Sequence, residues 1–98
     1  MRENAYQAYL KGLIETSFPG AIVIKNDSGY LQGIPDLLVL YKTRWAMLEV
    51  KPRANAAEQP NQRYYVDLFD GMSFAAFIYP ENEEDVLNDL QQVFASRR

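Results

Sequence analysis

The sequence predicts an α/β fold in which one mixed β-sheet is flanked by helices, with the element order αβββαβα. Two observations predict this class. Apolar residues recur at three- and four-residue spacing in three segments, which is the period of a helix. Four other segments are short and almost continuously apolar, as strands are when both of their faces are covered. The 98 residues, of which 48% are hydrophobic, suffice for one compact domain over residues 1–98.

The first part of the chain supplies a helix and a strand. Residues 3–18 are predicted to form the helix, which ends at the Pro-Gly pair that follows. Its apolar stripe consists of Tyr6, Tyr9, Leu10, Leu13 and Ile14. Residues 21–25 are apolar and β-branched, which predicts a strand, and residues 26–29 have the composition of a turn.

A β-hairpin is predicted next, with strands at residues 37–41 and 45–50 and a turn at residues 42–44. Both strands are apolar enough to be covered on both faces. Pairing through this turn makes the numbers of opposite residues sum to about 86. That register places Asp36 across from Val50.

The second half supplies a loop, two helices and the last strand. Residues 52–60 are polar and rich in Ala and Asn, which is typical of a loop, and residues 61–70 are predicted to form a helix ended by Gly71. Residues 73–79 are predicted to form a strand and residues 81–96 a final helix. The apolar face of that helix consists of Val86, Leu87, Leu90, Val93 and Phe94.

Composition limits the chemistry that the chain can perform. There is no Cys and no His, which excludes disulfide frameworks, thiol nucleophiles, zinc clusters and Ser-His-Asp triads. Any catalysis must therefore use carboxylates, Lys, Arg, Tyr or a hard metal ion held by oxygen atoms. No segment is long and apolar enough to cross a membrane, and the N-terminus lacks the apolar core of a signal peptide, so we expect a soluble cytoplasmic protein.

Charge is distributed unevenly along the chain. The net charge is −3 and the pI is near 4.8, which is unfavourable for binding a polyanion through bulk charge. Residues 1–65 hold eight basic and six acidic side chains, a balance of +2, whereas residues 66–98 hold two basic and seven acidic ones, a balance of −5. We interpret the acidic run over residues 81–89 as the solvated face of a helix.

Two carboxylates and an ammonium group are expected at one end of the hairpin. Alternation along a strand gives Glu49 and Lys51 the same face, and the predicted register brings Asp36 close to both. A structural ion pair between Lys51 and a carboxylate is one explanation. The other is a divalent metal ion bound by Asp36, Glu49 and the Val50 carbonyl, with Lys51 acting on the attacking water or on the charge that develops at a phosphate.

These residues resemble the PD-(D/E)XK nuclease superfamily, and within it the VRR-Nuc branch and the phage-type Holliday junction resolvases. The matching residues are Glu3, Gly33-Ile34-Pro35-Asp36-Leu37, Glu49-Val50-Lys51, Gln62 and Gly71. The resemblance covers about residues 3 to 80. It implies a restriction-endonuclease-like αβββαβ core, here with an extra C-terminal helix, and an origin in a bacterium or a phage-infected cell.

The resemblance also implies a role for each matching site residue. Asp36 and Glu49 would bind Mg²⁺ or Mn²⁺, and Lys51 would be the catalytic lysine. Glu3 would be an auxiliary metal or water ligand, although a glutamate in the first turn of a helix commonly serves only the helix dipole. Gln62 would orient the lysine or contact the phosphate, with Gln59 as its rival.

Basic and aromatic side chains provide candidate DNA contacts. The basic candidates are Lys25, Lys42, Arg44, Arg53 and Arg63. Tyr64 is a weaker candidate for stacking on an unpaired base, and Trp45 is expected to pack in the core or at an interface.

The function expected from the resemblance is metal-dependent endonucleolytic cleavage of branched DNA such as a four-way junction. Two symmetric cuts would require a homodimer, formed through the last helix or the apolar edge of the sheet. Two alternatives remain open. One is a nicking or restriction-type nuclease on linear DNA, and the other is a catalytically silent DNA-binding module.

Overall fold

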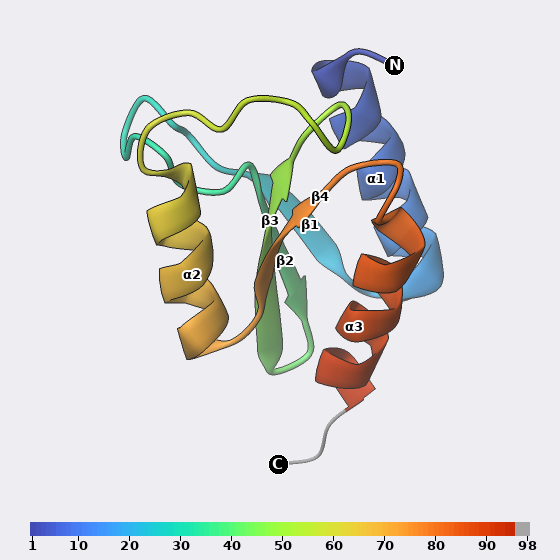
Figure 1. Ribbon diagram of the computed structural model, residues 1–98. Coiled ribbons are helices and arrows are strands. Elements are labelled where there is room, and N and C mark those ends of the chain that lie inside the picture. Colours follow the sequence, from blue (N-terminus) through green and yellow to red (C-terminus); the bar gives the residue numbers. More distant parts are fainter. Residues whose placement is uncertain (96–98) are drawn as a thin grey trace.

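The computed structural model describes residues 1–95 and confirms the predicted fold class, a mixed sheet flanked by helices in the order αβββαβα (Figure 1). The elements are α1 (Glu3–Ser17), β1 (Ile22–Lys25), β2 (Leu37–Tyr41), β3 (Arg44–Val50), α2 (Gln62–Met72), β4 (Ala75–Ile78) and α3 (Glu83–Ala95). Ser96, where the last helix was predicted to end, lies outside the described residues. None of the helices within residues 1–95 has the length and apolarity that a membrane span requires.

The sheet has the strand order β1-β2-β3-β4. The first three strands pair in antiparallel fashion, and β3 pairs with β4 in parallel. The predicted register of the hairpin is wrong by one residue, because Leu37 lies opposite Leu48 and Asp36 is therefore level with Glu49 rather than Val50. The reason is a tighter turn: Tyr41 already pairs with Arg44, since Lys42 adopts the left-handed conformation that a two-residue hairpin loop needs (φ 56°).

The helices form layers on the two faces of the sheet. In Figure 1, α1 and α3 lie together on one side of the sheet and α2 lies on the other. The core between the sheet and the helices α1 and α3 contains Tyr6, Leu10, Ile14, Phe18, Val23, Leu37, Val39, Ala46, Leu48, Val50, Ile78, Val86, Leu90 and Phe94. Tyr9, which the helical period assigned to the buried stripe, is 46% exposed.

The second face of the sheet is only partly covered. Within the described residues, α2 packs on β3 and β4. The expectation that the hairpin is covered on both faces therefore holds for β3 and fails for β2, where Leu38 and Leu40 are half-buried. Their partners on β1, Ile24 and Ile22, are 41% and 57% exposed on the same face.

The end of α2 also differs from the prediction. The helix continues through Gly71 to Met72, and Gly71 does not adopt a positive φ. Its last turn closes at Ser73, whose backbone N–H donates to the Phe69 carbonyl at 2.9 Å. The Asp70 carboxylate then accepts the backbone N–H of Ala75 at 3.1 Å, which ties the helix end directly to β4. This connection needs no left-handed glycine.

Candidate active site

The predicted site residues meet where three elements come together. Antiparallel pairing places Asp36, just before β2, beside Glu49 at the end of β3. Leu48 and Val50 point into the core against α1 and α3, so the alternate residue Glu49 points toward α2. Gln62 is the first residue of α2 and therefore reaches the same end of the sheet.

The carboxylate of Asp36 is hydrogen-bonded to the neighbouring strand β3. Its Oδ2 accepts the backbone N–H of Val50 at 2.9 Å, and its carbonyl accepts the backbone N–H of Asn26 at 2.8 Å. The Val50 side chain itself is fully buried in the core. The hydrogen bond from the Val50 N–H thus fixes the position of the Asp36 carboxylate at the end of the strand. It does so without pairing the carboxylate with a cation.

Glu49 is a buried carboxyl group whose hydrogen bonding is incomplete. Its side chain is 1% exposed, and Oε2 accepts a hydrogen bond from Gln62 Nε2 at 2.9 Å. Within residues 1–95, Oε1 is buried and no donor group of the protein is within hydrogen-bond reach of it. Burial, followed by the negative charge of Asp36 and a hydrogen bond between the two carboxyl groups, raises the pKa of Glu49 to about 9, although the ammonium group of Lys51 acts in the opposite direction.

Lys51 follows the end of β3 and is held by neutral acceptors. Its Nζ donates to Gln62 Oε1 at 2.7 Å and to the Ala57 carbonyl at 3.0 Å. Its distance to Glu49 Oε2 is 3.9 Å, although only 8% of the lysine side chain is exposed. The two shorter contacts of the ammonium group are with uncharged oxygens, so these contacts hold Lys51 more closely than its 3.9 Å ion pair with Glu49 does.

The side chain of Gln62 connects the lysine to the glutamate. Its Oε1 accepts from Lys51 Nζ and from the backbone N–H of Gln59 at 2.8 Å, and its Nε2 donates to Glu49. Gln59 joins the network through its backbone, because its N–H donates to Gln62 Oε1 and its carbonyl accepts the Gln62 N–H at 3.2 Å. Of the two candidate glutamines, Gln62 is the one whose amide lies between the charged groups. The Ala57 carbonyl and the Gln59 N–H were missed by the sequence analysis, because backbone groups of a loop leave no sequence signal.

Glu3 lies at the rim of the same cavity. This cavity has a volume of about 620 Å³ and is also lined by Asp36, Lys51 and Gln62. Partial burial and then the charge of Asp36 hold the pKa of Glu3 above its ordinary value. Gln7 Nε2 donates to its carboxylate at 3.3 Å. In the part of the chain that the structure describes, no three acidic groups are close enough to coordinate a metal ion as a trio, so Glu3 is not placed as a metal ligand beside Asp36 and Glu49.

The paired carboxylates nevertheless fit a hard divalent cation. Mg²⁺ and Mn²⁺ bind carboxylate oxygens and usually retain several water ligands, so one or two carboxylates are enough. The buried Oε1 of Glu49 has no other partner, and a cation would remove the repulsion between Glu49 and Asp36. The donor set therefore matches the metal that the sequence predicts.

The five candidate DNA contacts are divided between the two ends of the molecule. Lys25 ends β1 beside Glu3 and Leu37, and Arg53 is exposed on the loop after Lys51. Arg63 is exposed in the first turn of α2, but it pairs with Glu58 and lies over the ring of Phe77 at 4.4 Å. These three residues lie at the site end.

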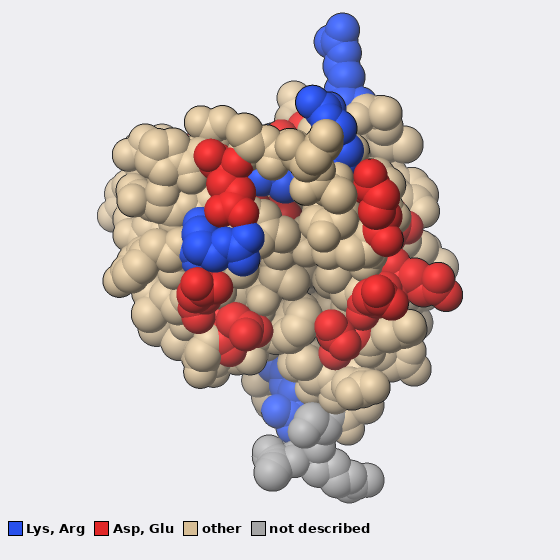
Figure 2. Space-filling view, in the orientation of Figure 1, with Lys and Arg blue, Asp and Glu red and all other residues tan. Residues whose placement is uncertain are grey.

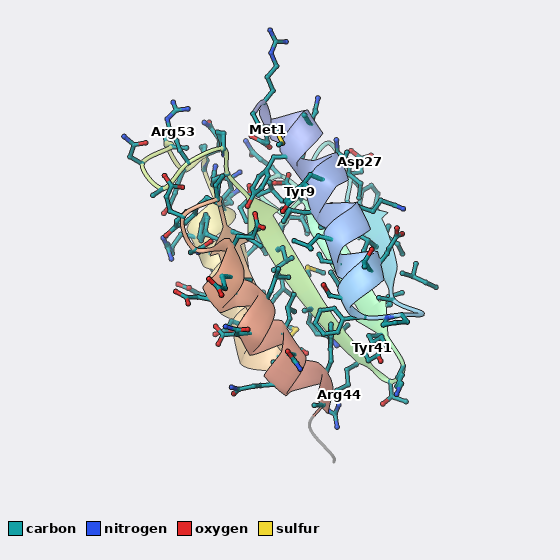
Figure 3. All side chains as sticks on the ribbon, turned by 90° about the vertical axis from the view of Figure 1, so that its right-hand side faces the viewer. Met1, Tyr9, Asp27, Tyr41, Arg44 and Arg53 are labelled. Atoms are coloured by element: carbon teal, nitrogen blue, oxygen red, sulfur yellow. The ribbon has the colours of Figure 1, made fainter. Side chains whose placement is uncertain are left out.

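Lys42 and Arg44 are not brought together with the site. Lys42 lies in the turn between β2 and β3 and Arg44 begins β3, at the opposite end of the hairpin from Asp36. Figure 3 shows Arg53 at one end of the molecule and Arg44 at the other. Trp45 is half-buried and packs edge-to-face against Phe69 of α2, and Tyr64 is 61% exposed.

Figure 2 shows the surface of the molecule in the orientation of Figure 1. Acidic side chains dominate the right-hand part of that surface, over α3.

The fold and the site together define a small α/β domain with paired carboxylates and a buried lysine at one end of its sheet. Among solved structures, the chain is similar to a protein described as a VRR_NUC domain protein, with a TM-score of 0.68 and 14% sequence identity, over 97% of this chain and 89% of that chain. This similarity supports the predicted likeness to the VRR-Nuc branch at the level of the fold. No family model and no curated protein matches the sequence.

Proposed function

We propose that this protein is a Mg²⁺- or Mn²⁺-dependent endodeoxyribonuclease that hydrolyses phosphodiester bonds in branched DNA. The observation that carries the proposal is the buried Oε1 of Glu49, which has no partner although Asp36 lies beside it and Lys51 is held nearby. A buried carboxylate oxygen that no donor reaches costs free energy; in the metal-free protein the proton that Glu49 retains up to about pH 9 lowers this cost, and a bound cation would replace that proton.

Each residue would have a separate task in this reaction. Asp36 and Glu49 would hold the cation, with the Val50 carbonyl as a third protein ligand, and Glu3 at the rim of the cavity would hold a water molecule. When bound, the cation would act as a Lewis acid on the phosphate. Lys51 carries three N–H donors and uses two of them on Gln62 and Ala57, which leaves one for the negative charge that develops on the phosphate oxygens.

Gln62 would act as a positioning residue. It restrains Lys51 through Oε1 and Glu49 through Nε2, so the ammonium group and the carboxylate keep their relative positions before substrate arrives. The fold similarity to a VRR_NUC domain protein supports the nuclease class.

Branched DNA and a twofold dimer complete the proposal. One site cuts one strand, so two symmetric cuts in a four-way junction require two copies of the chain. The exposed edge strand β1, with Ile22 and Ile24 on its uncovered face, is the surface that we assign to the dimer. The alternative surface, α3, begins with three acidic residues, which would repel a second copy.

The experiment that tests the function is cleavage of a labelled four-way junction and of a linear duplex of equal length. Each is incubated with the purified protein in Mg²⁺, Mn²⁺ or EDTA, and sedimentation of the same sample measures the oligomeric state. We expect paired nicks in the junction that require the metal. Cleavage of the duplex alone would indicate a nicking or restriction-type enzyme. If a folded protein cut neither substrate in any metal, the catalytically silent module would be the correct function.

Variants of the two charged groups connect cleavage to this site. We expect Asp36→Asn and Lys51→Ala each to lower the cleavage rate by at least about 100-fold. The asparagine keeps an oxygen that can accept the Val50 N–H, and Gln62 keeps the Gln59 N–H when the lysine is absent, so both variants should fold. Lys11→Ala, which removes an exposed lysine from α1, is the matched control. Equal rates for Lys51→Ala and this control would rule out the proposed role of Lys51.

A further inference from the structure

Tyr30 stands out among the apolar side chains because it is almost entirely in solvent. It is 92% exposed, more than Met1 at 75% or Met72 at 63%. Within residues 1–95 its ring stacks on no other aromatic side chain, and no hydrogen bond of its hydroxyl is recorded. A large aromatic ring that contributes nothing to the core is available for an external partner.

The segment that carries Tyr30 is held firmly although the ring itself is free. The Asp27 carboxylate accepts the backbone N–H of Gly29 at 2.8 Å, and the Asp27 carbonyl accepts the N–H groups of Tyr30 and Leu31 at 3.0 and 3.3 Å. Such a turn fixes the backbone of the tyrosine without using its side chain. The ring is therefore presented from a preorganised position, which lowers the entropic cost of binding.

The far side of this segment is pressed against the loop that leads into α2. Gly33 has a φ of 91°, and a Cβ atom there would lie 2.5 Å from the Cβ atom of Asn61. The segment over residues 26–34 and the loop over residues 52–61 thus form one unit beside the start of α2 (Figure 1).

The segment that carries Tyr30 borders the proposed catalytic cavity, although Tyr30 itself is not one of the lining residues. Residues on both sides of it in sequence line that cavity, namely Ser28, Gly29, Gln32 and Gly33. At the base of the same segment, the Asn26 N–H donates to the carbonyl of Asp36. The segment that carries Tyr30 is therefore hydrogen-bonded to the backbone of Asp36, whose carboxylate would hold the cation.

We propose that Tyr30 is a base-stacking platform that selects DNA with an unpaired or unstacked base next to the cleaved phosphate. This inference rests on the proposed function, because it assigns a substrate feature to the same site. In a continuous duplex each base is already stacked on both faces, so the ring gains nothing. At a junction, a fork or a strand end, a base offers a free face to an aromatic ring.

The test measures binding separately from cleavage, using full-length protein with the Asp36→Asn substitution. The probes are a four-way junction carrying 2-aminopurine beside the cut position and a linear duplex of equal length. We expect Tyr30→Ala to weaken binding of the junction by roughly 5- to 150-fold and to abolish quenching of the 2-aminopurine, because one base–aromatic stack is lost. Binding of the duplex should stay unchanged. Tyr30→Trp and Tyr30→Phe, which keep an aromatic ring, should restore both signals.

The matched control is Tyr9→Ala, which removes another exposed tyrosine from α1, on the other face of the sheet from α2. Three results would overturn the inference: unchanged junction binding by Tyr30→Ala, equal loss for junction and duplex, or a change in oligomeric state that shows a protein partner at this position. Cleavage by the wild-type protein together with any of these results would refute Tyr30 alone. Quenching that depends on Tyr30 in a protein that never cleaves DNA would refute only the proposed hydrolysis.

Discussion

Two glutamates, one on each side of the sheet, differ in how completely their carboxyl groups are hydrogen-bonded. Glu83 begins α3 and accepts one tyrosine hydroxyl on each carboxylate oxygen, from Tyr6 at 2.8 Å and from Tyr9 at 3.0 Å. Glu49 lies on the α2 side and is more deeply buried, yet only one of its oxygens has a partner among the described residues. The first glutamate is therefore satisfied by the fold itself, whereas the second is not.

This difference supports the proposed assignment of Glu49 to the metal site and of Glu83 to structure. The same fold that supplies two donors to a half-exposed carboxylate at Glu83 leaves the buried carboxylate at Glu49 next to a second acid. Buried polar groups in native proteins are nearly always paired, and exceptions concentrate where a ligand completes the shell. The contrast supports the proposed metal site independently of the fold similarity.

The strongest test of the comparison replaces each glutamate by glutamine. We expect Glu49→Gln to lower cleavage by at least about 100-fold and yet to raise the melting temperature of the metal-free protein at pH 7.5 by about 4 °C or more. Glu83→Gln should lower the melting temperature, because a glutamine side chain offers only one acceptor oxygen to Tyr6 and Tyr9, and should leave cleavage nearly intact.

The pH dependence of the higher melting temperature expected for Glu49→Gln follows from the raised pKa of Glu49. The folded protein holds the proton up to about pH 9, whereas an unfolded chain releases it near pH 4.5. The contribution of Glu49 to folding stability is therefore most favourable below pH 4.5 and falls as the pH rises toward 9. The stabilisation by Glu49→Gln should vanish at pH 4 and grow up to pH 8, as measured by thermal unfolding in EDTA. A lower melting temperature for Glu49→Gln at pH 7.5 would make Glu49 a structural group like Glu83.

A second test separates the two glutamines at the site. Gln62→Ala removes the amide that links Lys51 to Glu49, and losses of this kind typically cost 10- to 100-fold in activity or metal affinity. Gln59→Ala keeps the backbone N–H that Gln59 contributes and should change the rate little. Cleavage rates and metal titrations of both variants provide the measurement. Equal losses for the two would show that the amide of Gln62 has no special position.

The parts of the site that follow strand geometry could be predicted from the sequence. Alternation along β3 correctly gave Glu49 and Lys51 a common side, and the hairpin correctly brought Asp36 to them. The register was wrong by one residue because Lys42, which is not a glycine, adopts a positive φ and shortens the turn. Nothing in the sequence marks such a lysine.

The parts that depend on the long loop could not be predicted. The bonds from Lys51 to Ala57 and Gln62 form only because the chain between them folds back over the strand end. The same is true of the close contact between Gly33 and Asn61. These residues are 28 positions apart in the sequence, and local sequence patterns do not predict contacts between such distant segments. Gly71 shows the opposite error, since a residue typical of a helix end lies inside α2.

A third test concerns the close contact between the segment over residues 26–34 and the loop over residues 52–61, beside the cavity. At Gly33 an added Cβ atom would lie 2.9 Å from the Asn61 carbonyl carbon and 3.0 Å from the Pro60 oxygen, on a backbone with φ 91°. We expect Gly33→Ala to destabilise the protein by about 1–3 kcal/mol and to slow cleavage, because both loops beside the cavity must shift. Gly12→Ala, at an open position on α1, should instead stabilise by about 0.5–1 kcal/mol. Chemical denaturation measures both. A stable, fully active Gly33→Ala would show that the two loops are not one unit.

The smallest expected effect lies on the opposite side, at the hydroxyl of Tyr6. Burial, and next the hydrogen bond to Glu83, raise the pKa of Tyr6 well above 10, so the folded protein holds this proton more tightly than the unfolded chain does. Stability from this group is therefore fully present below pH 10 and is lost as the pH rises above it. Tyr6→Phe should cost about 1–2 kcal/mol at neutral pH, where it removes a hydrogen bond to a charged acceptor, and should lose less stability than the wild type between pH 10 and 12. Cleavage should be unaffected, since Tyr6 packs between α1 and α3 on the face opposite α2. A loss of cleavage without a loss of stability would contradict the assignment of Glu83 and its tyrosines to structure alone.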